Sequence, residues 1–470
     1  MLTLLILLHI YFVSFLNKPA QGEPALSDRA VAQRAQWNIA TDELDLPVNA
    51  TYLDALRQMG VGIHHTSRWF NGATCEMDET TAGLVAQLAF VTDVEMTRRD
   101  EESGEWKVES GKRKVVCTPP EYYTDAQLAT YNLTPLHDAG YEGQGILMAV
   151  CDGAFQNVPN LPCFRSELEL GHLDFTDDGD DFYGPTGSHG TACLSTISGL
   201  TDNYRGAATQ AQYYLIRTEE NDTESPKEMD NLVAALEAAD SLGVNVFSLS
   251  LGYYEFDNAA WDLNKQRDLD GKTTRCSRAA TIAARKGMLV CVSAGNERNN
   301  PWGTICAPAD ADSILTVGAV STDTIPGSFT SYGPSSDGRV KPEVCAVGVQ
   351  TALIRPSGVV AWSNGTSFST PLVAGMAACL WSALPNENAM QIRDRIIQSA
   401  HLYPNHDPAN LLGYGVPNAW EAYTMVPAGL DNGQWTMENG QSSSRKILRN
   451  GQIMIVRNGR EYTIIGTQKR

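Results

Sequence analysis

Between residues 119 and 425 of this 470-residue chain, short apolar runs alternate with alanine-rich stretches of helical periodicity. No other feature of the sequence restricts the possible folds as strongly as this alternation. Each apolar run is long enough for one buried strand, and each alanine-rich stretch is long enough for a connecting helix. Strands that alternate with helices form parallel sheets covered by helices on both faces. Residues 119–425 are therefore predicted to have an α/β fold of three layers, with a mostly parallel sheet between helices.

The same runs give the bounds of the expected elements. Helices are expected at 231–242 and 277–286, because Gly243 and Gly287 suit the conformation that closes a helix. Two more helices are expected at 369–384 and 387–399. Strands are expected at 146–151, 213–216, 244–250, 288–293 and 314–317.

The segments on either side of this region differ from it in composition. Residues 23–118 are polar and predict a small α+β domain, with helices at 51–59 and 82–88 and strands at 63–70 and 89–94. Residues 426–470 are predicted to be a linker and a basic tail, because positions 445–470 hold seven Lys or Arg and one acidic residue. Asn-Gly pairs at 450–451 and 458–459 predict β-hairpins in this tail.

The first residues have the composition of an export signal. Positions 1–16 are almost entirely apolar but fall short of the roughly 20 residues that span a bilayer. The small-residue stretch at 20–22 suits cleavage, whereas the usual positive charge at the start is missing. Residues 1–22 are predicted to be a signal peptide, so the protein is expected to be secreted or at the cell surface without a transmembrane anchor.

Two polar motifs stand at the ends of expected elements. Asp152 follows the strand at 146–151, and the carboxyl ends of parallel strands are where α/β sheets bind ligands. His189 lies between Gly187 and Gly190 at the start of a stretch with helical spacing. A carboxylate can hold a histidine in the tautomer that proton transfer needs. Taken alone, an Asp-Gly pair is usually a turn, and a histidine in a loop usually has no catalytic role.

Two further motifs supply a hydroxyl and an amide. Ser367 lies in the string Asn-Gly-Thr-Ser-Phe-Ser-Thr-Pro at 364–371, directly before a helix. Free backbone N–H groups and the helix dipole stabilise an oxyanion there, although Ser and Thr can also be simple N-caps. Asn296 closes the strand at 288–293, where its amide can donate to a developing negative charge or merely form a turn.

The order of these residues along the chain is Asp152, His189, Asn296 and Ser367. Asp before His before Ser is the order of subtilisin and differs from the orders of chymotrypsin and the α/β-hydrolases. With these motifs, residues 119–425 resemble the catalytic domain of the subtilisin-like serine proteases, the subtilases. The resemblance implies an endopeptidase that hydrolyses peptide bonds.

The resemblance also implies a role for each residue. Ser367 attacks the scissile carbonyl, His189 takes and returns the proton, and Asp152 orients the imidazole. Asn296 and the backbone N–H of Ser367 bind the oxyanion. Two tripeptides are similar to substrate-binding segments: Ser250-Leu251-Gly252 to the one that pairs with the substrate backbone, and Ser293-Ala294-Gly295 to a wall of the primary specificity pocket.

Other parts of the chain either match or depart from the family pattern. The family usually has Asp-Thr-Gly or Asp-Ser-Gly at the aspartate, whereas Asp152-Gly153-Ala154 lacks the supporting hydroxyl. Residues 23–118 occupy the place of the inhibitory, folding-assisting propeptide. The expected partners are therefore peptide or protein substrates and the chain's own propeptide as inhibitor. The basic tail resembles the C-terminal segments of proteins exported by bacterial type IX secretion systems.

Two other functions stay open. An inactive subtilase-like domain would bind peptides, but such copies lose one of the four site residues and this chain keeps them all. An esterase would show Gly-x-Ser-x-Gly followed by Asp and then His, and that order is absent. The net charge of −20 disfavours nucleic acid as a partner, because phosphate binding needs clustered Lys and Arg.

No cofactor is expected to be required, and no metal ligands are assigned. The acidic run at 174–181 can hold a structural calcium ion or form a solvated face. Cysteines inside apolar runs are expected to act as small hydrophobic residues: Cys151, Cys193, Cys291 and Cys379. Two pairs in polar surroundings can form disulfides in an oxidising compartment: Cys75 with Cys117, and Cys276 with Cys306.

Overall fold

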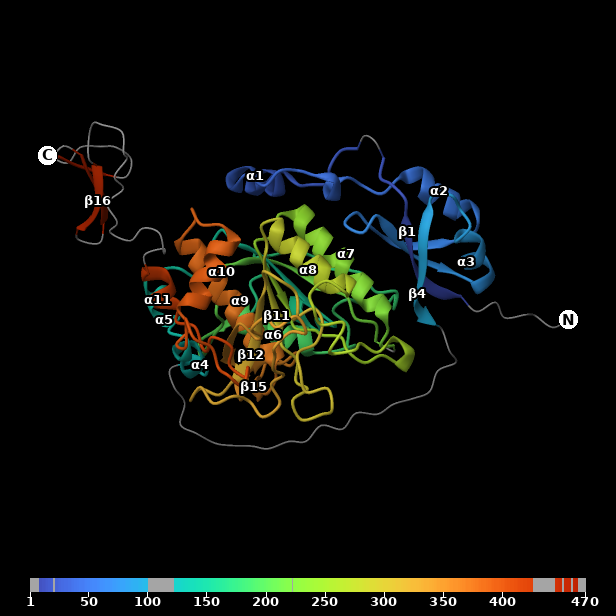
Figure 1. Ribbon diagram of the computed structural model, residues 1–470. Helices are drawn as coiled ribbons and strands as arrows, with labels where there is room; N and C mark the ends of the chain where they lie inside the picture. Colours follow the sequence, from blue (N-terminus) through green and yellow to red (C-terminus); the bar gives the residue numbers. More distant parts are fainter. Residues whose placement is uncertain are drawn as a thin grey trace. The chain divides into compact units, whose positions relative to one another are not determined.

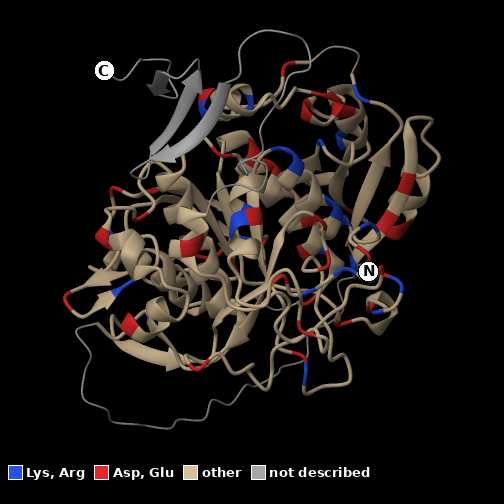
Figure 2. Cartoon of the chain, turned by 60° about the vertical axis from the view of Figure 1, so that its left-hand side comes forward, with Lys and Arg blue, Asp and Glu red and all other residues tan. Residues whose placement is uncertain are grey.

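The computed structural model describes residues 8–19, 22–99, 122–221 and 223–425, and three strands at 444–449, 452–457 and 460–463. The chain forms two units, Met1–Tyr423 and Thr424–Arg470, and each is described by itself. Within the described residues, no helix combines the length and the apolar character needed to cross a membrane. Acidic residues outnumber basic ones by 55 to 35 and are spread over many elements (Figure 2), which agrees with a role of the charge in solubility.

A seven-stranded parallel sheet lies at the centre of the larger unit (Figure 1). From β5 (Leu147–Asp152) the chain crosses to the edge strand β6 and then returns to β9 beside β5, whereas from β10 (Val246–Leu249) it moves outward through β11 and β12 to β13. The connections therefore leave the neighbouring strands β5 and β10 in opposite directions. Such a switch point leaves a crevice at the carboxyl ends of the strands, where α/β proteins bind ligands. From edge to edge the strands are β13 (Val344–Val347), β12 (Leu315–Val320), β11 (Leu289–Ser293), β10 (Val246–Leu249), β5 (Leu147–Asp152), β9 (Gln212–Arg217) and β6 (Glu169–Asp174).

Helices cover both faces of this sheet, as the alternating pattern predicts. Helices α6 (His189–Ser198) and α9 (Thr366–Ala383) pack together on one face, and α7 (Pro226–Leu242) and α8 (Arg275–Arg285) pack together on the other. Alternate residues of β5 join different apolar clusters: Met148 lies with α9, and Ala149 with α7 and α8. The three-layer α/β fold is therefore confirmed.

All five expected strands and all four expected helices are present, with small shifts of their bounds. Helix α7 begins earlier than expected because Pro226 occupies the first turn and Glu228 accepts a hydrogen bond from the Ser225 N–H. Strand β6 was not expected, since it lies at the sheet edge and alternates partly buried with exposed residues instead of forming an apolar run. The remaining elements of this domain are α4 (Asp125–Thr130), α5 (Thr134–Asp138), β7 (Leu200–Thr201), β8 (Tyr204–Arg205), β14 (Thr351–Ile354), β15 (Val360–Ser363), α10 (Ala389–Gln398) and α11 (Ala419–Thr424).

The N-terminal part forms the predicted α+β domain, but it begins earlier than the sequence suggests. Its antiparallel sheet has the order β2 (Gly62–Ser67), β3 (Gly72–Met77), β1 (His9–Phe15), β4 (Val91–Arg99). Its helices are α2 (Ala50–Gln58) and α3 (Glu79–Val85), which together with the sheet form a separate apolar cluster.

Strand β1 contradicts the predicted boundary at residue 22. It pairs with β3 on one side and β4 on the other, so residues 9–15 are the interior of the domain rather than a leader outside it. Both faces of the strand are buried: Val13 packs in the domain's own cluster, and the ring of Phe12 lies 4.5 Å from the Arg275 guanidinium on α8. A strand buried on both faces is a continuous apolar run, which is also the pattern of a signal peptide.

The N-terminal domain docks on the outer face of α7 and α8. Arg68 donates to both the carboxylate of Asp240 and the backbone oxygen of Glu237 on α7, at 2.7 and 2.9 Å. On α8, Arg275 contacts Glu95 of β4 as well as Asp230 of α7. The ion pairs of Arg68 with Asp240, which is buried, and of Arg275 with Glu95 join the two domains.

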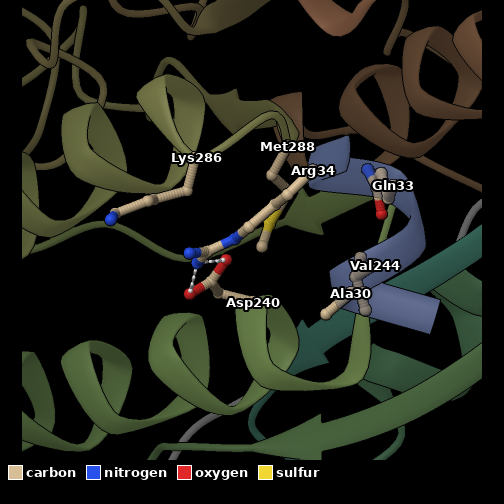
Figure 3. Close-up of a pocket in the computed structure, with 8 residues that line it drawn as sticks. Ala30, Gln33, Arg34, Asp240, Val244, Lys286 and Met288 are labelled. Carbon is tan, nitrogen blue, oxygen red and sulfur yellow. Dashed lines mark hydrogen bonds and ion pairs between the residues drawn. The ribbon is translucent and has the colours of Figure 1, made fainter. Parts of the chain in front are cut away.

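Helix α1 (Asp28–Trp37) extends this interface to the amino-terminal ends of the central strands. Arg34 donates to both oxygens of Asp240 at 2.7 Å, and Figure 3 shows this contact beside Lys286. Arg29 donates to Asn245 Oδ1 and to the backbone oxygen of Gly243, just before β10. The cavity left between α1 and these residues is about 10 Å³, near the lower limit for a single water molecule. The contact is closely packed.

The C-terminal unit is an antiparallel sheet of β16 (Ser444–Arg449), β17 (Gln452–Arg457) and β18 (Arg460–Thr463). The register pairs Arg449 with Gln452 and Arg457 with Arg460, which leaves two residues for each connection. The predicted turns at 450–451 and 458–459 lie outside the described residues. The strands on either side confirm the hairpin pattern.

Candidate active site

Asp152 and His189 meet at the carboxyl end of the sheet. Asp152 is the last residue of β5 and is fully buried, and its carboxylate accepts a hydrogen bond from the Gly153 N–H at 2.9 Å. His189 is the first residue of α6, and its Nδ1 lies 2.8 and 2.9 Å from the two oxygens of Asp152. A carboxylate in this position assigns the proton to Nδ1 and leaves Nε2 free to accept one. The Gly153 N–H thus supports the carboxylate of Asp152, although the hydroxyl that the subtilases usually have after this aspartate is missing.

Gly190 allows this meeting. A Cβ on Gly190 would lie 2.5 Å from the backbone oxygen of Ala154 and 2.9 Å from the Cβ of Asp152. Its N–H donates to the same oxygen of Ala154 at 2.9 Å. The start of α6 can therefore reach the loop after β5 only with glycine next to the histidine.

Ser367 is the second residue of α9, after Gly365 at the N-cap. The ring of the next residue, Phe368, lies 5.7 Å from the imidazole ring of His189, so the starts of α6 and α9 are neighbours. Among the described residues, the Ser367 hydroxyl donates to the backbone oxygen of Ser250 at 3.5 Å and makes no hydrogen bond to His189. Catalytic hydrogen bonds are often long or unformed without substrate, so this geometry is compatible with a nucleophile.

Asn296 is held with its amide oxygen toward the start of α9. Its Oδ1 accepts from the backbone N–H of Thr366 at 2.9 Å and from the Thr366 hydroxyl at 3.1 Å. Because the oxygen is engaged, the Nδ2 group is left to donate elsewhere. The structure thus brings Asn296 and Ser367 together at the positive end of a long helix.

The histidine is partly exposed, at 43% of its side chain, and its pKa is shifted. Desolvation lowers the pKa of His189, but attraction to the carboxylate of Asp152 and the hydrogen bond between them outweigh this effect. The pKa of His189 is therefore well above its ordinary value of 6.5. An imidazolium stabilised in this way suits a base that carries a proton during the reaction.

Cys193 is a neighbour of the site that sequence reasoning treated only as a small hydrophobic residue. It lies one turn after His189 on α6, with its Sγ 3.8 Å from His189 Nδ1, and it donates to the backbone oxygen of Ser367 at 3.3 Å. Burial raises the pKa of the Cys193 thiol. The neutral thiol therefore packs between the two helix starts.

The two predicted substrate-binding tripeptides lie at the carboxyl ends of neighbouring strands, β10 and β11. The Ser293 hydroxyl donates to the backbone oxygen of Leu251 at 3.2 Å, which ties the two segments together. Ser250 donates to the backbone oxygen of Ser367 at 2.8 Å. Gly252 is exposed, and neither its N–H nor its backbone oxygen is bonded within the described residues. A substrate backbone can therefore pair with it.

A group of three carboxylates near Asp152 was not anticipated. Oxygens of Glu219, Glu224 and Glu228 lie within 4.8 Å of one another. Burial raises the pKa of Glu219 to about 8 and that of Glu224 to about 7. The signal in the sequence was an acidic stretch directly after β9, whose carboxyl end lies beside that of β5.

Part of the acidic run at 174–181 is paired with cations of the protein. Asp174 contacts Arg217, and Asp177 lies 2.8 Å from Lys227 and 2.7 Å from His64. The two groups of potential metal ligands found in the described residues lie elsewhere in the chain. The calcium ion considered for this run stays a prediction.

The disulfide considered possible between Cys276 and Cys306 is not formed, since both thiols are free and buried. Cys276 instead donates to the hydroxyl of Thr274 at 3.5 Å. Cys75 is also free and buried, and its predicted partner Cys117 lies outside the described residues. The cysteines expected to act as small hydrophobic residues are all buried: Cys151, Cys193, Cys291 and Cys379.

Comparisons with known proteins agree with this geometry. The model of the subtilase family, Peptidase S8, matches residues 143–415, which is more than half of the chain. The model of the peptidase S8 propeptide domain of Bacteroidota matches residues 10–112. The second match begins within β1 and so agrees with the earlier start of the N-terminal domain.

Individual relatives align with the central region. Subtilisin NAT of Bacillus subtilis subsp. natto is 30% identical over 271 residues, which is 56% of this chain and 63% of that protein. M-protease of Shouchella clausii is 27% identical over 285 residues, 60% of this chain and 65% of that protein. The chain thus spans less than two thirds of the length of these relatives.

A solved structure supports the fold. The MycP3 protease from the type VII (ESX-3) secretion system is 22% identical with a TM-score of 0.53, over 66% of this chain and 90% of that one.

Proposed function

Because the chain belongs to the subtilase family, we propose that it is a secreted serine endopeptidase whose triad is Asp152, His189 and Ser367. The observation that carries the proposal is the contact of His189 Nδ1 with both oxygens of Asp152, at 2.8 and 2.9 Å. This contact orients the imidazole at the helix start that neighbours Ser367. The exposed backbone of Gly252, which is unpaired within the described residues, suits an extended peptide as substrate. No comparable feature of the site favours another class of substrate.

The proposed reaction is acyl transfer through the serine. The Ser367 Oγ attacks the scissile carbonyl carbon while His189 Nε2 takes the hydroxyl proton, and Asp152 stabilises the resulting imidazolium. His189 then gives this proton to the leaving amine as the C–N bond breaks. Water then attacks the acyl carbon while His189 takes a proton from it. His189 returns this proton to the Ser367 Oγ as the acyl bond breaks, which restores the serine hydroxyl.

The proposed oxyanion hole consists of the Asn296 amide and the Ser367 N–H. The contact between Asn296 Oδ1 and Thr366 supports it, because that contact presents the amide nitrogen as a donor in a fixed direction. The donors would stabilise charge that develops only in the transition state. Neither the reaction nor the hole requires a cofactor.

A fluorophosphonate probe, which reacts with activated serine hydroxyls, tests the assignment of the nucleophile. Labelling of the mature protein at Ser367 is expected, as determined by mass spectrometry of the digested adduct. Labelling of any other serine, or none, would contradict the proposal and favour an inactive peptide-binding domain.

Hydrolysis is expected to weaken on acidification through a pKa above 6.5, because only neutral His189 can accept the serine proton. The pKa of His189 is raised, so the fraction of neutral imidazole falls before the pH reaches the ordinary range of histidine. The pH profile of kcat/KM measures this ionisation in the free enzyme. An acidic limb centred at or below pH 6.5 would disagree with the described contact.

We also propose that the N-terminal domain is the inhibitory propeptide. Its described residues contact α7, α8 and the amino-terminal edge of the sheet, and none of their hydrogen bonds or ion pairs involves Asp152, His189 or Ser367. The described contacts of the folded domain therefore lie away from the three proposed triad residues. Inhibition is proposed to depend on residues 100–121, which connect β4 to the catalytic domain.

A propeptide fragment of residues 8–118 is expected to bind the catalytic domain, whereas a fragment of residues 23–118 is not. The shorter fragment lacks β1, which joins β3 to β4, and so loses the centre of its sheet. Binding and inhibition of peptide hydrolysis by residues 119–470 are measured for both fragments. Equal binding by the shorter fragment would contradict the role of β1, and binding without inhibition would identify a permanent partner domain.

Export is proposed from two features. The second unit is a basic three-stranded sheet, and its sequence resembles the terminal segments of proteins that use type IX secretion. The propeptide match is to a domain of Bacteroidota. We propose that residues 426–470 direct the protein to the exterior or to the cell surface.

A further inference from the structure

The two substrate-binding tripeptides are joined at one end by a third segment, residues 305–307. The N–H of Tyr253 donates to the backbone oxygen of Ala307 at 2.8 Å, and the Ala307 N–H donates back to Tyr253 at 3.1 Å. The N–H of Cys306 donates to the backbone oxygen of Ala294 at 3.2 Å. Cys306 is therefore bonded to one wall of the proposed pocket and flanked by a residue bonded to Tyr253, which directly follows the other wall.

The side chain of Cys306 fills the space between the glycines of these walls. A Cβ on Gly252 would lie 2.9 Å from the Cβ of Cys306, and a Cβ on Gly295 would lie 2.8 Å from its Sγ. Both distances are shorter than real Cβ contacts, so Cys306 leaves no room for a side chain at Gly252 or at Gly295, where the Ser331 hydroxyl lies almost as close at 2.9 Å. Cys306 itself is only 2% exposed. The thiol thus closes the gap between the walls.

The thiol acts there by its volume and not by charge. Burial raises the pKa of Cys306 well above the ordinary value, so the group stays neutral. It forms no disulfide. The neighbouring carboxylate of Glu297 accepts hydrogen bonds from Tyr254, at 3.0 Å, and from Asn300, so its oxygen is already engaged. The thiol at the closed end of the gap is consequently small and uncharged.

We propose that Cys306 forms the floor of the pocket for the substrate residue before the scissile bond and restricts that residue to a small side chain, such as Gly, Ala or Ser. The inference rests on the proposed peptidase function and on the two tripeptides as pocket walls. It names the substrate class: peptides that are cut after small residues. A larger side chain would have to displace packed atoms, and overpacking of a filled site is unfavourable.

Peptides that differ only in the residue before the scissile bond test the proposal on mature enzyme prepared from the full chain. Wild type is expected to show a kcat/KM at least about tenfold higher for Ala than for Phe, the scale of a mismatch of one or more methylenes in a pocket. Cys306→Gly removes the floor and is expected to shift the Phe-to-Ala ratio by about tenfold or more toward Phe. Cys306→Ser has a similar volume and is expected to keep the preference for Ala.

Two results would overturn the inference: wild type that cleaves after Phe as well as after Ala, or an unchanged ratio in Cys306→Gly. If Cys306→Gly fails to fold, Cys306→Ala, which removes only Sγ, decides the question with the same peptides and the same two criteria. Fluorophosphonate labelling of Ser367 in every preparation separates this outcome from failure of the proposed function. A labelled enzyme without a size preference refutes only the role of Cys306, whereas unlabelled protein that cleaves no peptide refutes both.

Discussion

Replacement of Ser367 by alanine is expected to lower kcat by on the order of 10⁶-fold, a scale taken over from the nucleophile of subtilisin itself. The alanine removes the only atom that forms the acyl bond, and His189 then has no proton to accept. Ser367 is 8% exposed and its hydroxyl makes a single long hydrogen bond of 3.5 Å within the described residues. The fold is therefore expected to survive the change, as measured by thermal unfolding beside steady-state kinetics.

Ser369→Ala is the matched control for this variant. Ser369 lies in the same helix and is fully buried, and its hydroxyl donates to the backbone oxygen of Thr366 at 3.0 Å. A hydroxyl is thus removed two residues further along the same helix without touching the proposed nucleophile. Activity above a tenth of wild type in Ser367→Ala would show that Ser367 is not the nucleophile, whereas an equal loss in Ser369→Ala would show that the loss is not specific to the Ser367 hydroxyl.

Asn296→Ala is expected to lower kcat by about 10²–10³-fold with little change in KM. The amide is proposed to meet charge that exists only in the transition state, so its loss leaves substrate binding nearly unchanged. Steady-state kinetics with one peptide separates the two constants. A change confined to KM would mean that Asn296 only lines the cleft.

Asn296→Asp distinguishes the proposed donor from a structural role. Aspartate keeps an oxygen that can accept from Thr366 at the start of α9, but it has no N–H to offer. If Asn296 acts as the donor, the aspartate variant is expected to lose at least as much activity as the alanine variant, since a second negative charge repels the oxyanion. Activity retained by aspartate but lost by alanine would assign Asn296 to holding the helix start.

The four proposed catalytic residues could be found from the sequence because each stands where a regular element begins or ends. Asp152 ends a buried apolar run, and His189 and Ser367 begin helices whose spacing is visible in the sequence. The distances between them could not be predicted. The meeting of Asp152 and His189 depends on the close approach allowed by Gly190, which appears only once the backbone of Ala154 is in place.

The failures have a common cause, which is contact between segments far apart in the chain. Strand β1 looked like a signal peptide because α8 covers its second face, through Arg275 and Phe12. Cys276 and Cys306 looked like partners because their sequence surroundings are polar, although both are buried in the fold. Edge strand β6 gave no apolar run, since only half of its residues turn toward other parts of the protein.

Helix α1 has a consequence for the order in which the catalytic domain folds. Through Arg29 and Gln33 it bonds to Gly145, to Asn245 and to Gly287, which precede β5, β10 and β11 respectively. These strands are separated by long stretches of chain, and closing such loops before parallel pairing is a slow step. A helix that contacts all three starting points gathers them at one end of the sheet. With the starts aligned, the opposite ends of the same strands arrive together, and those are the ends that carry Asp152 and lead to Asn296.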